Sequence, residues 1–538
     1  MSPQMQTSER SPLLASGDAA ASTKPNPRPS RIRELGLFVW ALAATSAVIM
    51  IAVWAQHVQQ TAPHHPPKHH ASKRNLVFMV SDGMGPASLS LTRSFRQHID
   101  DLPIDDVLTL DRHFWGTSRT RSSSSLVTDS AAGATAFSCG RKSYNGAISV
   151  TPDHEPCGSV LEAAKKAGHV LVRSMQDEIA MQEIGASSPL GRSVDLILGG
   201  GRCHFLPNHT DGGCREDDID VVQLALDKYN WTYAGDRKSF DALEGGEKVD
   251  LPILGLFAHY DFPFELDRRN QNDVYPSLSE MATTALRALE KATADSDKGF
   301  FIMIEGSRID HAGHINDPAA QVHEVIEYDK AFKAVLDFIE SSETETVLVA
   351  TSDHETGGLA TALQEPGHLP VYNWYPEALA RANSSCEYLA SKLIERVSST
   401  SETKKKLKTW INEELVIGGL GIAHATDEEL EYLIAHPDLS VNIFAAMISL
   451  RAHVGWSTHG HTALDVNIYS SGPDSASVIR GNVENTDVGK YLRSYLDVDV
   501  EEVTTLLKKQ LKLAEMKGSL NFGAKKLHEK DYHRNEEV

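Results

Sequence analysis

Ser130 is the residue of this sequence best placed to act as a nucleophile. It follows Asp129 and precedes Ala131-Ala-Gly-Ala134, small residues that a helix accepts. A serine on the first turn of a helix lies at the positive end of the helix dipole, where an alkoxide or a phosphoryl ester is stabilised. The alternative is that Ser130 only caps the helix, because Asp and Ser are both favoured caps.

Acids and histidines follow three short apolar runs. The runs and the residues after them are 75–80 with Asp82, 300–304 with Glu305, and 346–351 with Asp353 and His354. Such runs are typical of buried strands in a parallel sheet. Ligands of open α/β sheets bind at the carboxyl ends of the strands, so we expect these side chains to meet there. Carboxylates packed together require a cation or a hydrogen-bond network, which indicates a metal site.

Two further clusters carry residue types that bind metals. Asp310 and His314 are four positions apart, so on a helical turn they share a face and can bind one ion. His459 and His461 precede another strand-like run. Imidazole and carboxylate together suit Zn²⁺, whereas all-oxygen clusters suit Mg²⁺.

The remaining patterns define the fold class. A fourth apolar run, 193–198, ends in three glycines, and helical patterns cover 158–167 and 279–292. Strands that alternate with helices predict an α/β architecture.

The chain also shows segments outside this core. We expect a disordered cytoplasmic tail at 1–34, a transmembrane signal anchor at 35–55 and a Pro- and His-rich linker at 56–74. A catalytic domain at 75–499 follows, and then a charged, solvated helix and tail at 500–538. The anchor has 21 uncharged residues, enough to cross a hydrocarbon core. Basic residues before it favour a single-pass type II orientation, with the catalytic domain in a lumen. Residues 9–14 have the acid-x-x-x-Leu-Leu form of a sorting signal that an adaptor complex reads.

Other features agree with a lumenal domain. Three glycosylation sequons begin at Asn208, Asn230 and Asn383. The five cysteines allow at most two internal disulfides, and their spacing suggests Cys139–Cys157 and Cys203–Cys214, with Cys386 left over. The net charge of −21 argues against nucleic acid as a partner.

Six motifs, taken together, closely resemble those of the alkaline phosphatase family, above all the membrane-anchored vacuolar enzymes of fungi. They lie in family order at 80–85, 127–133, 198–202, 304–314, 351–358 and 460–465. The resemblance implies a central, mostly parallel sheet with helices on both faces and a variable insertion at about 362–455. It also implies hydrolysis of small phosphate monoesters in a vacuolar lumen, and a homodimer.

The resemblance assigns roles residue by residue. Ser130 would be phosphorylated transiently, with one zinc held by Asp82, Asp353 and His354. The second zinc would be held by Asp310, His314 and His461, and one Mg²⁺ by Glu305 with Asp82. His461 is favoured over His459 by its spacing to Asp465, and His311 fills a position that is basic in the family. Arg173 would clamp the phosphate, oriented by Asp129.

The sequence departs from the family directly before Arg173. A strand and a loop that carries two magnesium ligands are missing near 169–172, either through a true deletion or through an error in the gene model. We therefore expect exposed sheet edges, an incomplete magnesium site and reduced activity. One alternative is an impaired or inactive metal- or phosphate-binding membrane protein. Another is a phosphodiesterase or sulfatase of the same superfamily.

Overall fold

The computed structural model describes residues 35–48, 50, 73–165, 171–172, 175–187, 191–399 and 402–516. The chain divides into two units, Met1–His70 and Ala71–Val538. In the first unit the structure describes an apolar helix over Leu35–Val48, and residues 51–55 of the predicted anchor lie outside the described residues. Among the described helices, none is by itself long and apolar enough to cross a membrane. Asp427–Ala435 and Pro437–Ala452 reach the required length and apolar content only together, across a bend of 105°.

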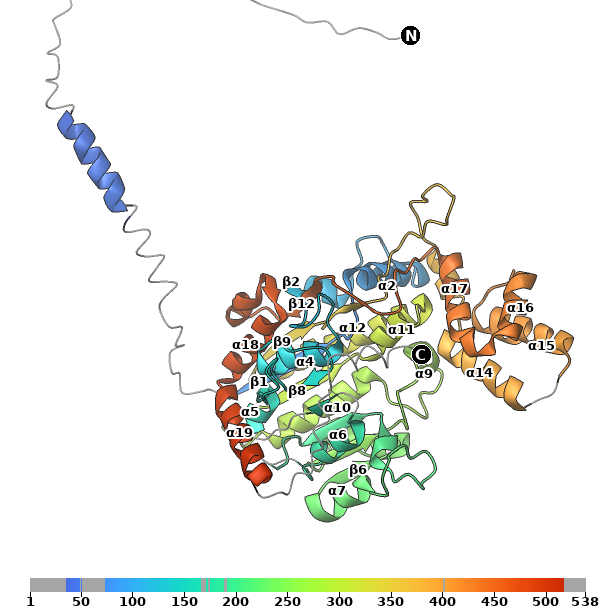
Figure 1. The fold of residues 1–538 in the computed structure, drawn as a ribbon, viewed down its shortest axis with the longest axis horizontal. Helices are drawn as coiled ribbons and strands as arrows, with labels where there is room; N and C mark the ends of the chain where they lie inside the picture. Colours follow the sequence, from blue (N-terminus) through green and yellow to red (C-terminus); the bar gives the residue numbers. More distant parts are fainter. Residues whose placement is uncertain are drawn as a thin grey trace, which may run out of the picture. The chain divides into compact units, whose positions relative to one another are not determined.

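A six-stranded sheet forms the centre of the second unit (Figure 1). Its order is β13 (Gly481–Glu484), β2 (Phe114–Arg119), β12 (Val466–Ser470), β9 (Glu345–Thr351), β1 (Arg74–Val80) and β8 (Phe301–Glu305). The strands pair in parallel except β12, which is antiparallel to both of its neighbours. The sheet is therefore mostly parallel, and the three strands predicted to carry the site, β1, β8 and β9, lie side by side.

Helices cover both faces of this sheet. Successive side chains of a strand point to opposite faces, so β1 contacts helices on both. Val77 and Met79 pack with α10 (Leu278–Ala292) and α12 (Pro318–Ser341). Leu76 and Phe78 point to the opposite face and pack with α4 (Ser130–Cys139) and α18 (Asn485–Leu496). Burial on both faces explains why the sequence of β1 is continuously apolar.

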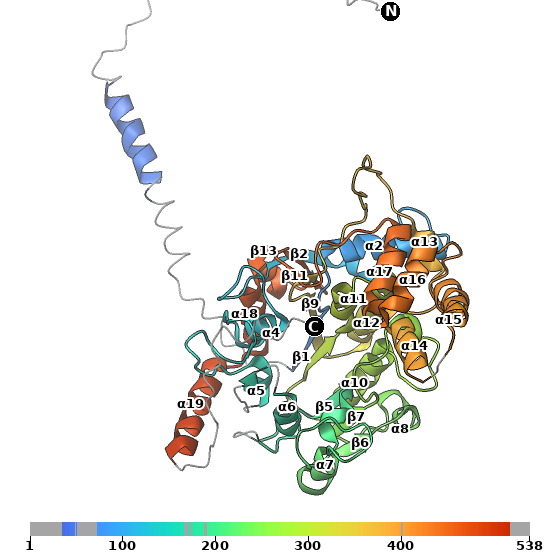
Figure 2. The same ribbon diagram turned by 45° about the vertical axis from the view of Figure 1, so that its right-hand side comes forward.

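The fourth predicted strand forms in a separate sheet. β5 (Leu196–Gly199) pairs in parallel with β7 (Ile253–Leu256), which pairs with β6 (Thr232–Ala234). Figure 2 shows this three-stranded sheet beside α6 (Gln176–Glu183), α7 (Val221–Tyr229) and α8 (Arg237–Asp241). Both β5 and β8 are terminal strands of their sheets.

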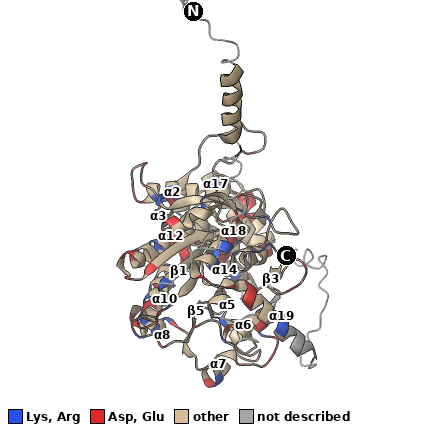
Figure 3. Cartoon of the chain, turned by 90° about the vertical axis from the view of Figure 1, so that its left-hand side faces the viewer, with Lys and Arg blue, Asp and Glu red and all other residues tan. Residues whose placement is uncertain are grey.

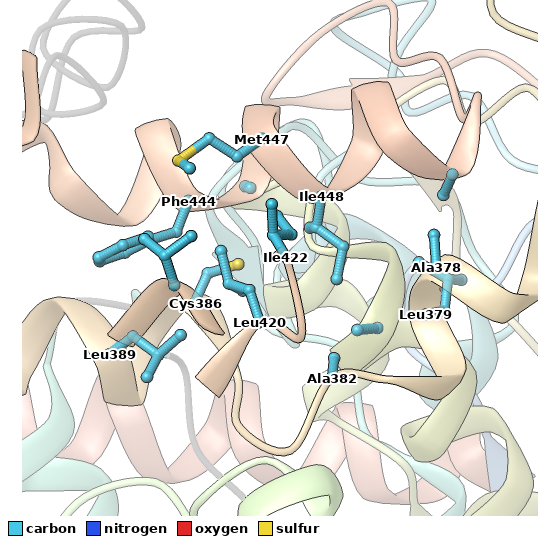
Figure 4. Packing of buried hydrophobic residues seen from close by; sticks show 14 of the residues in the cluster. Ala378, Leu379, Ala382, Cys386, Leu389, Leu420, Ile422, Phe444, Met447 and Ile448 are labelled. Atoms are coloured by element: carbon cyan, nitrogen blue, oxygen red, sulfur yellow. The ribbon is translucent and has the colours of Figure 1, made fainter. Parts of the chain in front are cut away.

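The predicted insertion contains a group of helices whose apolar core also includes residues of α2 (Pro86–Ile99) and α12. The helices are α13 (Pro376–Ala380), α14 (Cys386–Ser399), α15 (Lys404–Trp410), the π-helix Ile411–Gly419, α16 (Asp427–Ala435) and α17 (Ser440–Ala452). In Figure 4, Phe444 and Met447 of α17 lie above Cys386 and Leu389 of α14. The buried Cys386 is thus part of the hydrophobic packing.

The C-terminal helix corrects one expectation. α19 (Val500–Met516) packs against α5 (Val160–Lys165), with Val503 and Ala163 in one apolar cluster. The backbone N–H of Gly158 donates to Thr504 Oγ1 at 2.9 Å. The first turns of the helix are therefore docked and not fully solvated, because its valines supply an apolar face. Between α5 and α6, β4 (Leu171–Val172) pairs antiparallel with β3 (Ala147–Ile148).

Candidate metal centre

Turns and short elements at the carboxyl ends of the central strands bring the predicted site residues together. Asp82 follows β1, and Asp353 and His354 follow β9. Asp310 and His314 lie on α11 (Arg308–His314), directly after β8. The last contributor is His461 in the short strand β11 (His461–Thr462), which pairs with β10 (Glu355–Thr356).

Ser130 is the first residue of α4, and Asp129 is the N-cap. Asp129 Oδ1 accepts from the backbone N–H of Ala132 at 2.9 Å, and its Oδ2 accepts from that of Gly146 at 2.7 Å. The capping role therefore belongs to Asp129, which leaves the Ser130 hydroxyl at the positive end of the helix. Ser130 Oγ lies 3.1 Å from His354 Nε2.

One group of ligand atoms surrounds Ser130 Oγ. His354 Nε2 lies 3.1 Å from Asp353 Oδ2 and 3.5 Å from Asp82 Oδ1. Asp353 and His354 are buried, whereas Ser130 and Asp82 are half-buried. Two carboxylates, one imidazole and a hydroxyl thus converge where the site opens toward solvent.

A second group lies on the other side of His354. His461 Nε2 lies 3.1 Å from His314 Nε2 and 3.6 Å from Asp310 Oδ1. His314 Nε2 lies 3.3 Å from Asp310 Oδ2. The i, i+4 spacing of Asp310 and His314 on α11 produces this approach, as the sequence predicts.

Both groups fit zinc in donor type and in spacing. At zinc–nitrogen distances of about 2.0–2.1 Å, two ligands of a tetrahedral ion lie about 3.3 Å apart. The distances of 3.1 to 3.6 Å within the two groups match that value. Nitrogen and carboxylate oxygen are the donors that Zn²⁺ accepts beside sulfur.

Thr356 connects the two groups. Its hydroxyl donates to Asp310 Oδ1 at 2.5 Å and lies 3.2 Å from His354 Nδ1. If His354 Nδ1 carries the ring proton, it donates a hydrogen bond to the hydroxyl. The lone pair of His354 Nε2 can then bind a metal ion. The carbonyl of Thr128 lies 2.8 Å from His461 Nδ1 and orients that ring in the same way. Both contacts lie behind predicted ligand residues, and residue type alone does not reveal them.

The pKa values of the ligand residues shift in different directions: burial opposes protonation of His354, but the charges of Asp353 and Asp310 raise its pKa. Burial opposes ionisation of Asp310, but the hydrogen bond from His314 and the charge of His354 hold its pKa well below the usual range. Burial and the charge of His354 lower the pKa of His461 to about 4. Near neutral pH the carboxylate is therefore ionised and the His461 imidazole is neutral.

Two glycines permit the close approach of these elements. A Cβ on Gly133 of α4 would lie 2.8 Å from the Cβ of Asp353, and one on Gly83 would lie 2.5 Å from the Cα of Asp310. Gly83 also has φ of +76°, a conformation that side chains rarely adopt.

Other predicted residues lie around the centre. Glu305 ends β8 and pairs with Val80, so it and Asp82 lie at the carboxyl ends of adjacent strands. His459 Nδ1 lies 2.7 Å from the carbonyl of His314, a ligand-supporting position outside the two groups. His311 Nδ1 lies 2.6 Å from Arg308 Nη1, and burial and this arginine lower the pKa of His311. The predicted phosphate clamp, at position 173, lies outside the described residues.

Both predicted disulfides form, Cys139–Cys157 and Cys203–Cys214. Cys203, His204 and Cys214 make a third cluster of metal-binding types, but the disulfide occupies both sulfurs. The sequon residues Asn208, Asn230 and Asn383 are exposed.

The comparisons with known proteins decide the family. Residues 73–178 and 169–498 match the alkaline phosphatase family model. The chain belongs to the alkaline phosphatase family. It is 47% identical to the repressible alkaline phosphatase of Saccharomyces cerevisiae, over 93% of this chain and 94% of that protein. It is 44% identical to an alkaline phosphatase of Schizosaccharomyces pombe, over 80% and 83% of the two chains.

Solved alkaline phosphatases share the fold. The cold-active enzyme of Shewanella sp. superposes with a TM-score of 0.63 at 27% identity, covering 78% of this chain and 99% of that one. The enzyme of Thermus thermophilus gives 0.65 at 24% identity, covering 84% and 98%. This alkaline phosphatase is therefore an enzyme that hydrolyses phosphate monoesters and uses metal cofactors.

The family match also bears on the connection before Arg173. Its two matched ranges overlap at residues 169–178. Such an overlap is expected of a chain that lacks part of the family sequence there. The predicted departure, near 169–172, falls within this overlap.

Proposed function

We propose that Ser130 forms a phosphoserine intermediate during hydrolysis of small phosphate monoesters. The observation that carries this proposal is the position of Ser130 Oγ, 3.1 Å from His354 Nε2 at the start of α4. Ser130 Oγ attacks phosphorus, forming an O–P bond as the bond to the alcohol oxygen breaks. Water then attacks phosphorus, releasing inorganic phosphate and restoring the hydroxyl.

The protein's own groups prepare this step. Asp129 fixes the first turn of α4, so that the Ser130 hydroxyl faces the two ligand groups. The helix dipole favours the negative charge that develops on Oγ and on the phosphoryl oxygens. Arg173 is the proposed clamp for two of those oxygens.

Metal ions complete the proposal. Zinc in the two groups would supply charge that makes a serine alkoxide and a hydroxide available near neutral pH. Asp82, Asp353, His354 and Ser130 would hold one ion, and Asp310, His314 and His461 the other. Asp82 and Glu305 would hold one Mg²⁺, and if the deletion before Arg173 is real, water would fill the remaining positions.

The test is to trap the intermediate. The full-length zinc-loaded protein is incubated with a ³²P-labelled aryl phosphate at acidic pH and quenched. We expect label on Ser130, no label on Ser130→Ala, and full label on Ser138→Ala, a matched change on the same helix. Stable folding and zinc content without label would refute the intermediate and favour a metal- or phosphate-binding role. Turnover of phosphodiesters or sulfate esters above that of monoesters would favour the other enzyme class.

We also propose a single-pass type II protein of the vacuolar membrane with a glycosylated lumenal domain. The apolar helix Leu35–Val48, two disulfides and three exposed sequon asparagines support it. Disulfides persist in oxidising compartments. Isolated vacuoles should protect the domain from added protease, and endoglycosidase should reduce its mass. An adaptor complex would read residues 9–14, so changing both leucines should misdirect the protein.

The partners follow from the same proposal. We expect a homodimer, which sedimentation of the purified domain would measure. Nucleic acid remains outside the proposal, since the net charge is −21 and Figure 3 shows acidic and basic residues interspersed along the chain.

A further inference from the structure

The start of α14 connects the insertion to the elements that carry the site. The backbone N–H of Cys386 donates to Asp317 Oδ2 at 2.8 Å, and that of Ser385 donates to Asp267 Oδ1 at 3.0 Å. Both carboxylates are buried. Asp317 is the N-cap of α12, the helix that follows α11. The first turn of α14 is therefore fixed against the segment next to α11.

Glu387, also in this first turn, contacts α11 itself. Its Oε1 accepts from Arg308 Nη2 at 2.7 Å. Arg308 is the first residue of α11 and is only 7% exposed, whereas Glu387 is exposed. The Arg308 guanidinium also lies 3.8 Å from the ring centroid of the buried Phe264, a cation–π contact. An acid of the insertion and an aromatic ring thus hold the guanidinium in one place.

The other end of the guanidinium contacts His311. Arg308 Nη1 lies 2.6 Å from His311 Nδ1 and 3.4 Å from Asp261 Oδ2. A guanidinium has donors and no acceptor, so His311 Nδ1 must be the acceptor. Asp261 Oδ2 is 3.8 Å from the same nitrogen, too far for a hydrogen bond. Arg308 therefore selects the neutral tautomer of His311 that carries its proton on Nε2.

The position of His311 makes this tautomer relevant to the site. His311 and His314 are three positions apart on α11, so their rings lie on one side of the helix. His311 is half-buried and belongs to neither ligand group. A protonated ring nitrogen cannot bind a metal ion, but it can donate to an anion.

We propose that Arg308 and Glu387 are positioning residues for His311. They fix the imidazole with its proton on Nε2, and this N–H donates to a phosphoryl oxygen of the bound monoester or of the phosphate product. The inference rests on the proposed function, because it needs a phosphate beside the ligand groups. Through Glu387, the insertion affects substrate binding although it supplies no ligand to either group.

The first test measures the tautomer. Full-length zinc-loaded protein labelled with ¹⁵N-histidine is studied by solid-state NMR at about pH 8.5, where an unperturbed imidazole is neutral. His311→Gln identifies the His311 signals by their loss. We expect the proton on Nε2 in the parent and a mixture of both tautomers in Arg308→Met. A proton on Nδ1 in the parent, or the same tautomer in both proteins, would overturn the proposal.

The second test measures binding of inorganic phosphate, and it serves if Arg308→Met fails to fold. Glu387→Ala should raise the Kd of phosphate and the KM for an aryl phosphate about three- to tenfold, the usual effect of one lost hydrogen bond. The kcat should stay within about twofold, because substrate and transition state share the bond. Removal of an acid would by charge alone strengthen phosphate binding, so weaker binding distinguishes positioning from electrostatics.

Two variants control for the charge and for the helix. Glu387→Gln keeps an acceptor for Arg308 Nη2 and should bind phosphate nearly as the parent does. Glu395→Ala removes another exposed acid of α14 and should also leave the Kd unchanged. Unchanged or tighter binding by Glu387→Ala would overturn the proposal.

Labelling of Ser130 separates this proposal from the proposed function. Labelled Ser130 together with an unchanged Kd in Glu387→Ala would refute only the role of Arg308 and Glu387. Weaker phosphate binding in Glu387→Ala without any label on Ser130 would support that role and refute only the phosphoserine intermediate.

Discussion

The imidazole rings of His354 and His461 lie face to face, with centroids 3.5 Å apart and an interplanar angle of 18°. His354 belongs to the group around Ser130 and His461 to the group around Asp310, so the stacked rings form a common wall. Each ring also has one nitrogen held from behind, by Thr356 or by the carbonyl of Thr128. The two ligand groups are consequently not independent, and a substitution where they meet should alter metal binding in both.

Thr356→Val should lower zinc affinity about 10–100-fold, the usual effect of losing a hydrogen bond behind a metal ligand. Valine keeps the shape of threonine but takes the hydroxyl from Asp310 and His354. Zinc content after dialysis against graded chelator measures the change. Thr356→Ser retains the hydroxyl and should bind zinc nearly as the parent does. Full retention of zinc by the valine variant would argue against the bridging role.

Gly133→Ala should reduce kcat about 100-fold, because the added methyl would displace α4, and Ser130 with it, away from Asp353. Overpacking of this kind also costs about 1–3 kcal/mol in stability. Steady-state kinetics and thermal unfolding measure both effects. Ala134→Ser adds one atom on the exposed face of the same helix and should behave like the parent. An unchanged kcat in Gly133→Ala would show that α4 does not need this close contact.

The free energy of unfolding should depend on pH because of the buried side chain of His323. This residue is buried, and burial with the charge of Arg269 lowers its pKa to about 3. The folded state therefore keeps His323 neutral, so its stability is present above the unfolded pKa of about 6.5 and is lost as pH falls. Between pH 6.5 and 5 the loss is about 2 kcal/mol.

Urea unfolding at several pH values measures this dependence. His323→Gln removes the titrating group and should flatten the slope by up to one proton. His368→Gln, at an exposed histidine, should leave the slope as it is. Identical slopes for the parent and His323→Gln would show that the buried imidazole is not the source.

If the deletion before Arg173 is real, the proposed magnesium site keeps two protein ligands, Asp82 and Glu305, and stimulation by Mg²⁺ should require millimolar concentrations. Glu305→Gln should remove the remaining response. Turnover of zinc-loaded protein against added Mg²⁺ measures both. A version with the family's strand and loop restored between α5 and α6 should saturate at lower concentration and turn over faster. Saturation of the short chain at micromolar Mg²⁺ would contradict this prediction.

The sequence alone predicts the central strands and the convergence of their carboxyl ends. Apolar runs bounded by turn residues predict β1, β8 and β9; β1 and β9 are buried on both faces, whereas β8, at the end of the sheet, is buried on one. Their ends then place Asp82, Glu305 and Asp353 at one edge. The i, i+4 rule places Asp310 beside His314 for a local reason, the helical repeat.

Other relationships depend on packing that no local pattern contains. The membership of β5 in a separate sheet depends on its pairing with β7, which periodicity within β5 does not encode. Whether Asp129 or Ser130 caps α4 depends on backbone angles, because both residue types are favoured caps. The role inferred for Thr356 rests on its two contacts. A threonine after a metal-binding motif cannot be recognised from its residue type alone.

The order of the ligands along the chain has a consequence for synthesis. Asp82 emerges early from the ribosome, whereas His461 emerges only after the helices of α13 to α17. Contacts between such distant segments form late, because a long loop must close first. A chain that stops before β11 could bury much of its sheet and still lack one side of the centre. Catalytic activity therefore requires that nearly the whole chain has been translated.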